Sequence, residues 1–122
     1  MLELLTNLPD DVIGIEATGR VGAGDYASVL QPAVEEMLAR HDRIRLLYVI
    51  GEGFEGYSSG AAWEDVKLGI GHWGAWERIA IVTDHGWMHD GLKAVGWMLP
   101  GEVRAFHAAE RAEATAWVAA RA

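Results

Sequence analysis

Ile44-Arg45-Leu46-Leu47-Tyr48-Val49-Ile50 is a nearly continuous apolar run in a chain of 122 residues. It begins and ends with isoleucine, and β-branched residues favour strands. A strand with one face in water alternates apolar and polar side chains, whereas an unbroken apolar run indicates burial on both faces. We therefore expect a central strand with helices packed on both of its faces.

Four further segments predict strands around this one. Residues 2–6 and 12–18 are apolar runs separated by the turn residues Leu8-Pro9-Asp10-Asp11, which predicts a β-hairpin. Residues 79–83 and 103–107 are short apolar segments later in the chain, and each predicts one more strand.

Four segments are expected to form helices. In the first, apolar residues recur at helical spacing over residues 29–38, with Asp25 as the expected N-cap. Pro32 lies inside this segment, and its ring removes one backbone hydrogen bond, so we expect a kink or a first turn that is wound separately. The other three predicted helices are residues 58–72, 87–99 and 108–122.

The order of these elements is β-β-α-β-α-β-α-β-α. Strands that alternate with helices indicate right-handed crossovers and parallel pairing. We therefore predict an α/β fold: a single-layer mixed, mostly parallel β-sheet flanked by about four helices, with an N-terminal antiparallel hairpin. The length fits one domain, which we expect to cover residues 1–122.

The composition excludes several kinds of partner and site. The chain has 10 basic and 18 acidic residues, a net charge of -8, which argues against a nucleic-acid partner and against electrostatic docking on an anionic membrane. It has no cysteine, which excludes disulfides and thiolate chemistry. No apolar run approaches the roughly 20 residues that cross a bilayer. We expect a cytoplasmic protein.

Gly51-Glu52-Gly53-Phe54-Glu55-Gly56 matches the G-x-G-x-x-G pattern of dinucleotide-binding loops. Its two glutamates would place negative charge beside a pyrophosphate, and the predicted helix begins only at Ser58, after the glycines. A flexible loop between strand and helix is therefore the favoured interpretation, and no cofactor is predicted.

Gly56-Tyr57-Ser58-Ser59-Gly60 matches G-x-S-x-G, the turn that exposes the nucleophilic serine of many hydrolases. Asp84 and His107 follow later strands and complete the Ser, Asp, His order. That turn must follow its strand directly, however, and here the motif begins six residues after the predicted strand. Helix capping by Ser58 or Ser59 is the favoured interpretation, and no catalytic residue is predicted.

His85 and His89 lie four positions apart and would share one helical face. Such a pair can hold a metal ion, with Asp84 or Asp90 as a further ligand. Two histidines alone do not make a metal site, so we predict none.

The chain has six tryptophans, five of them between residues 63 and 97. A core on the helical side of the sheet accounts for most of them. The predicted helix at residues 87–99 is apolar around most of its circumference, so a partner subunit, an apolar ligand or a lipid surface should cover part of it. Gly86, Gly91 and Gly96 lower its helix propensity and would let it move.

Short stretches over the whole chain form a familiar pattern. They are Leu8-Pro9-Asp10, Asp25-Tyr26, Pro32-Ala33-Val34, Leu46-Leu47-Tyr48-Val49, residues 62–69, residues 76–84, Trp87 and residues 100–104. In these stretches the chain resembles the SpoIIAA-like branch of the STAS superfamily. The resemblance implies a small mixed sheet flanked by helices and a non-enzymatic binding or regulatory role. This branch is also similar in topology to Sec14-type lipid-binding domains.

The resemblance also draws attention to Ser58 and Ser59. Sporulation anti-sigma-factor antagonists of this superfamily are switched by phosphorylation of a serine in an Asp-Ser-Ser-Gly-like motif at a helix start. Ser58-Ser59-Gly60 has a comparable place here, although Tyr57 stands where that motif has aspartate. Phosphate at a helix N-terminus is physically sensible.

Two functional hypotheses follow from the sequence. In the first, residues 58–72 and 87–99 bound an apolar cleft, with the second helix as a movable lid, and the module binds a lipid-like small molecule or a membrane surface. The residues expected to line that cleft are Trp63, Trp87, Met88 and Trp97. In the second, the same surface pairs with itself in a homodimer or with a regulatory protein, and Ser58 or Ser59 is a phosphorylation switch.

Overall fold

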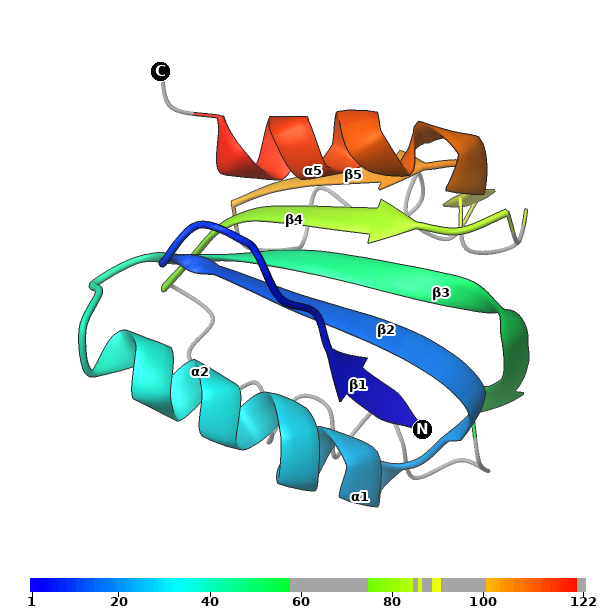
Figure 1. The fold of residues 1–122 in the computed structure, drawn as a ribbon, viewed down its shortest axis with the longest axis horizontal. Helices are drawn as coiled ribbons and strands as arrows, with labels where there is room; N and C mark the ends of the chain where they lie inside the picture. Colours follow the sequence, from blue (N-terminus) through cyan, green and yellow to red (C-terminus); the bar gives the residue numbers. More distant parts are fainter. Residues whose placement is uncertain (58–74, 85, 87–88, 91–100, 121–122) are drawn as a thin grey trace.

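The computed structural model describes residues 1–57, 75–84, 86, 89–90 and 101–120, and over these residues five strands form one sheet (Figure 1). In order across the sheet, the strands are β1 (Leu2–Leu4), β2 (Val12–Val21), β3 (Ile44–Tyr57), β4 (Trp76–Val82) and β5 (Glu102–Phe106). β1 pairs antiparallel with β2, and each later pair of neighbours is parallel. The predicted mixed, mostly parallel sheet with an N-terminal antiparallel hairpin is confirmed.

Two helices cover opposite faces of this sheet. α2 (Gln31–Leu38) packs on one face and α5 (Arg111–Ala119) on the other (Figure 1). Each helix closes a separate cluster of buried apolar side chains, so the sheet is the middle layer of three.

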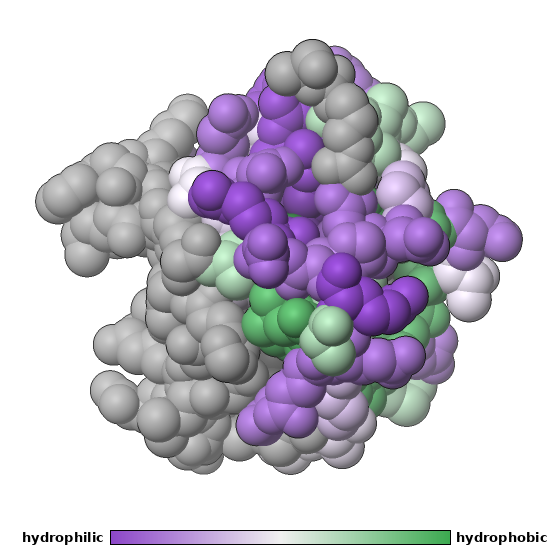
Figure 2. Space-filling view, turned by 90° about the vertical axis from the view of Figure 1, so that its left-hand side faces the viewer, coloured by the Kyte–Doolittle hydropathy of each residue, from purple (hydrophilic) through white to green (hydrophobic). Residues whose placement is uncertain are grey.

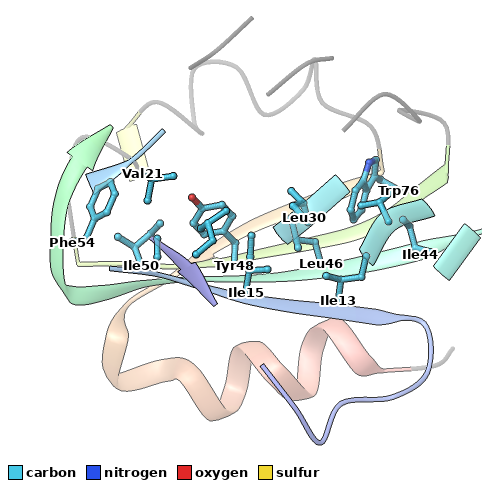
Figure 3. Close-up of a cluster of buried hydrophobic side chains, with 13 residues drawn as sticks. Ile13, Ile15, Val21, Leu30, Ile44, Leu46, Tyr48, Ile50, Phe54 and Trp76 are labelled. Atoms are coloured by element: carbon cyan, nitrogen blue, oxygen red, sulfur yellow. The ribbon is translucent and has the colours of Figure 1, made fainter. Parts of the chain in front are cut away.

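The central strand β3 is buried on both faces, as its unbroken apolar sequence predicts. Leu46, Tyr48 and Ile50 belong to the cluster beneath α2 (Figure 3), whereas Leu47 and Val49 belong to the cluster beneath α5. Successive side chains of a strand point to opposite faces, so one apolar run supplies both cores.

The chain enters α2 through α1 (Ala23–Asp25) and a π-helical turn, η1 (Tyr26–Leu30). Pro32 lies in the first turn of α2, where a missing N–H removes no hydrogen bond within the helix. The first turn is therefore wound separately, as the proline predicts. Leu30 and Val34, each 1% exposed, anchor this region against the sheet.

Asp25 is not the N-cap that the sequence predicts. It ends α1, and its carboxylate Oδ2 accepts a hydrogen bond from the backbone N–H of Gly22 at 2.9 Å. The N–H of Asp25 donates in return to the Gly22 carbonyl oxygen at 3.1 Å. The prediction fails because the helical segment already begins at Ala23, so Asp25 reaches back to the residue before the helix.

The last predicted helix is present but has two parts. A 3-10 turn, η4 (Ala108–Glu110), leads directly into α5. Ala114 and Val118, both fully buried, face the sheet from α5. Trp117 packs on the same cluster.

The prediction of about four flanking helices needs correction. Within the described residues there are two helices of eight or more residues, α2 and α5. The predicted helices at residues 58–72 and 87–99 lie almost wholly outside those residues, which accounts for the difference. None of the helices in the described part of the chain is long and apolar enough to cross a bilayer.

Candidate functional site

Polar side chains meet where β4 and β5 end. Asp84 follows β4 and His107 follows β5, and the carboxyl ends of parallel strands share one edge of a sheet. Asp84 Oδ1 lies 3.4 Å from His107 Nδ1 and accepts a hydrogen bond from the backbone N–H of Ala108 at 2.9 Å. Open parallel sheets commonly bind ligands at this edge, so it is the first place to look for a site.

His89 joins this pair from the segment after β4. Its ring stacks on the ring of His107, with the centroids 4.5 Å apart and the planes inclined by 17°. Its Nε2 lies 2.8 Å from the carbonyl oxygen of Thr83. A carbonyl only accepts hydrogen bonds, so Nε2 carries the proton that it donates.

The Asp84–His107 pair differs from the acid and base of a hydrolytic triad. In such triads the aspartate is buried and holds the histidine ring in one orientation. Here the Asp84 and His107 side chains are 68% and 64% exposed, so water competes for both groups. This exposed arrangement suits hydrogen bonding better than the activation of a nucleophile.

The end of β3 also leads away from that pair. β3 pairs with β4 only as far as Val49 and Val82, and beyond that point it continues beside β2 until Tyr57 pairs with Val21. The described part of β3 therefore ends at Tyr57 beside β2. Ser58 lies outside the described residues, so the grouping of Ser58, Asp84 and His107 suggested by the sequence order is not tested.

The glycine motif at residues 51–56 is not the loop that the sequence predicts. These residues continue β3, and β2 pairs with them through an irregular register, in which Gly19 opposes Phe54 and Arg20 opposes Gly56. The irregularities insert extra residues in β3, and Gly56 has a positive φ of 118°. The motif therefore bends a long strand, and its backbone pairs with β2 instead of cradling a phosphate.

The metal hypothesis rested on His85 and His89. His85 lies outside the described residues, and among those that the structure describes no group of three or more His, Asp or Glu side chains could hold a metal ion. Stacked rings direct their nitrogen lone pairs along nearly parallel planes, so His89 and His107 do not converge on one ion.

The contact between His89 and His107 was not predicted from the sequence. Helical spacing grouped His89 with His85, and the Ser, Asp, His order grouped His107 with Ser58. A topological signal was present only for Asp84 and His107, which follow the ends of the neighbouring parallel strands β4 and β5.

The face of the sheet beneath α2 continues as an apolar surface toward β5. Ile79 and Ile81 of β4 pack against the cluster beneath α2 (Figure 3 shows part of it). Val103 and Ala105, their partners on β5, point the same way, and both are partly buried. Within the described residues this cluster contains no residue of β5, so α2 does not extend its cover to that strand.

The opposite end of the molecule carries the amino ends of the parallel strands. Over its described residues this end is largely hydrophilic (Figure 2). Arg40, Asp42 and Arg43 are exposed in the turn between α2 and β3. This end of the molecule resembles an ordinary solvated surface. The candidate sites are therefore the edge at the carboxyl ends of the strands and the apolar face of the sheet.

The residues predicted to line a ligand cleft, Trp63, Trp87, Met88 and Trp97, lie outside the described residues. The predicted phosphorylation sites, Ser58 and Ser59, lie outside them as well. Their roles remain predictions, because the structure brings none of them into a described contact.

Comparison with known proteins identifies the family. The SpoIIAA-like family model matches residues 12–119. A similar solved structure is an uncharacterized protein of the DUF3478 family from Shewanella loihica PV-4, described as having a SpoIIAA-like fold. It is 28% identical, the match covers 96% of this chain and 93% of that one, and the TM-score is 0.72. The comparison with curated proteins gives no match. The family match spans the strands β2 to β5 and the helices α2 and α5, so the chain belongs to the SpoIIAA-like family, as its resemblance to the STAS superfamily predicts.

Proposed function

We propose that this domain is a non-enzymatic regulatory module that binds a lipid-like apolar ligand or a membrane surface. The SpoIIAA-like fold suggests the regulatory part of this proposal. The apolar part rests on one observation: the row of Ile79, Ile81, Val103 and Ala105 runs from the cluster beneath α2 to β5, a strand with no described residue in that cluster. Ligand sites are commonly lined on one side by an apolar surface next to the packed core.

The other wall of the proposed site comes from the segments that carry the tryptophans. Trp63, Trp87, Met88 and Trp97 would line it, as their sequence pattern predicts. Methionine and tryptophan together form an adaptable apolar surface, which suits ligands with flexible acyl chains.

The net charge narrows the choice of ligand. At -8, the chain would be repelled by anionic lipid surfaces. Binding would therefore depend on apolar contact, and a neutral or zwitterionic lipid suits this domain better than an anionic one.

Native mass spectrometry of the purified protein tests this proposal together with tryptophan fluorescence. We expect a co-purified mass of lipid size, or a fluorescence change when a fatty acid or phosphatidylcholine vesicles are added. Phosphatidylserine vesicles serve as the charged comparison and should bind more weakly. A ligand-free mass combined with unchanged fluorescence in all three titrations would contradict the proposal.

A second candidate is a protein-interaction module, and the exposed edge strand favours it. β1 pairs on one side with β2, and Leu4 in it is 53% exposed, an unusual place for a large apolar side chain. This module would form a homodimer or bind a regulatory protein, with Ser58 or Ser59 as a switch. A strict monomer in light scattering at high concentration would exclude the dimer. Unchanged partner binding by Ser58→Asp and Ser59→Asp would exclude the switch.

A further inference from the structure

β1 lies at the edge of the sheet, where an extended chain can add through main-chain hydrogen bonds. In Figure 1 no described segment crosses in front of this strand. We propose that β1 binds an extended segment of a partner protein with an apolar–basic–apolar pattern, and that the basic side chain lies beside Glu3. This proposal rests on the protein-interaction candidate, for which it names the partner, and it is independent of the lipid site.

The backbone of β1 faces its outer edge at alternate residues. The N–H of Leu5 donates to the Gly14 carbonyl oxygen at 2.8 Å. The N–H of Thr18 donates to the Met1 carbonyl oxygen at 2.9 Å. In an antiparallel ladder, residues that bond the neighbouring strand alternate with residues whose N–H and C=O point away from it. Leu4 is one of the latter, so its N–H and C=O point away from β2, toward an added strand.

One face of this edge carries an apolar side chain in contact with solvent. Leu2 is 4% exposed and belongs to the cluster beneath α2. Leu4 is two residues further along the same face but is 53% exposed. An exposed leucine on an edge strand favours pairing with another chain. An apolar residue of an added strand, opposite Leu4, would remove its side chain from water.

The other face of the edge is acidic. Glu3 lies directly opposite Glu16 of β2, and like charges in this position destabilise a sheet. Arg111 approaches the pair from α5, and its Nη1 lies 3.9 Å from Glu16 Oε1. A basic side chain of an added strand would approach from the other side, with its Cβ about 5 Å from that of Glu3. It would offset the repulsion between the two carboxylates.

The charge of Glu3 also argues against a second copy of this chain as the occupant. The antiparallel register that pairs Leu2 with Leu4 between two copies would bring both Glu3 side chains together at the twofold axis. The net charge of -8 adds further repulsion between copies. A charged residue on a short edge strand limits indiscriminate pairing, and here it would select partners by the sign of their charge.

A peptide titration followed by NMR of the backbone amides tests the proposal. The probe is the end-blocked peptide Ser-Thr-Val-Lys-Val-Thr-Ser, and the control peptide has glutamate in place of lysine. At low ionic strength, we expect the lysine peptide to shift the Leu4 amide signal and slow its hydrogen exchange. Its affinity should be about fivefold higher than that of the glutamate peptide.

Three results would overturn the proposal. The first is equal affinity for the two peptides, and the second is no change at Leu4 with millimolar peptide. If the peptide shifts other amides instead, the protein-interaction candidate stands but β1 is not its surface. The third is a Leu4 shift that depends on protein concentration without peptide, which would make a second copy the occupant.

Two variants separate the roles of charge and backbone. Glu3→Gln keeps the size of an exposed side chain but removes its charge, so the preference for the lysine peptide should fall from about fivefold to none. Leu4→Pro removes the outward N–H and no hydrogen bond to β2, so both peptides should bind at least about fivefold more weakly. Circular dichroism checks that the fold is retained. Fatty-acid titrations of Leu4→Pro should match the wild type, so failure of the edge and failure of the lipid site are read separately. An unchanged preference in Glu3→Gln would overturn the proposal.

Discussion

The guanidinium of Arg45 and the carboxylate of Glu77 form an ion pair at the end of α5. Arg45 Nε donates to Glu77 Oε1 at 2.8 Å, and the Arg45 side chain is only 6% exposed. Its Nη1 donates to the carbonyl oxygens of Val118 and Ala120, the last of which lies just beyond the helix. One buried cation therefore joins β3, β4 and the carboxyl end of α5, where a positive charge is favourable.

Glu77→Ala should destabilise the fold by about 2 kcal/mol, because it leaves the buried charge of Arg45 without its counter-charge. This value is below that for a fully buried pair, since Glu77 is 37% exposed and water can replace part of its role. Urea unfolding followed by circular dichroism measures the loss. Arg43→Ala is the matched control, because Arg43 lies 4.0 Å from the same carboxylate but is 60% exposed. Its effect should stay below about 0.5 kcal/mol, and equal losses would show that burial does not set the strength of the pair.

Ala114→Leu should destabilise the fold by about 1–3 kcal/mol, because Ala114 is fully buried between α5 and the sheet and a larger side chain overpacks that space. Ala112 lies on the exposed side of the same helix. Ala112→Leu should change the free energy of unfolding by less than about 0.5 kcal/mol. Thermal unfolding of both variants compares them, and a similar loss in each would mean that α5 does not pack as described.

Proline is tolerated in α2 only at its start. Glu36→Pro places the ring in the interior of the helix on an exposed residue, removes a backbone hydrogen bond and should cost about 3 kcal/mol. Pro32→Ala should change stability by less than about 1 kcal/mol, mainly through the greater freedom of the unfolded chain. Urea unfolding measures both. A small effect of Glu36→Pro would indicate that α2 contributes little to the stability of the fold.

The sheet was predictable because its signals are local. The unbroken run at residues 44–50 supplies side chains to both clusters, so its composition alone indicates a strand with two buried faces. The extension of β3 to Tyr57 was not predictable, because glycines and glutamates at residues 51–56 are typical of loops. This segment forms a strand because its backbone pairs with the second half of β2.

The candidate site was predictable only in part. Asp84 and His107 could be expected at one edge, since parallel strands end together. The stack of His89 on His107 could not, because it depends on the path of the chain after β4 and not on any spacing in the sequence. The network of Arg45 likewise joins residues more than thirty and more than seventy positions apart, a range at which sequence patterns carry no signal.

Gly101→Ala should destabilise the fold by about 2 kcal/mol or more. Gly101 has a φ of 65°, which costs an L-residue about 1 kcal/mol, and an added Cβ would lie 2.5 Å from the Trp76 carbonyl oxygen. That oxygen belongs to β4 and cannot move without disturbing the sheet. Gly53→Ala is the control, because nothing lies within 4 Å of its added Cβ and its φ is not positive. Thermal unfolding should show little change for Gly53→Ala, and equal melting temperatures for the two variants would contradict the described turn before β5.

Val103→Asn tests whether the apolar face is a wall of the ligand site. Val103 is partly buried beside Ile79, on β5, a strand with no described residue in the cluster beneath α2. An unpaired amide against an apolar ligand is unfavourable by about 1–3 kcal/mol, so the affinity for a fatty acid should fall about tenfold in a tryptophan fluorescence titration. Ala112→Asn places the same side chain on the exposed side of α5, on the other face of the sheet, and should leave the affinity unchanged. Circular dichroism of both variants checks that the fold is retained. If a folded Val103→Asn binds as tightly as Ala112→Asn, the ligand does not contact this face, and the tryptophan-bearing segments would have to form the site without it.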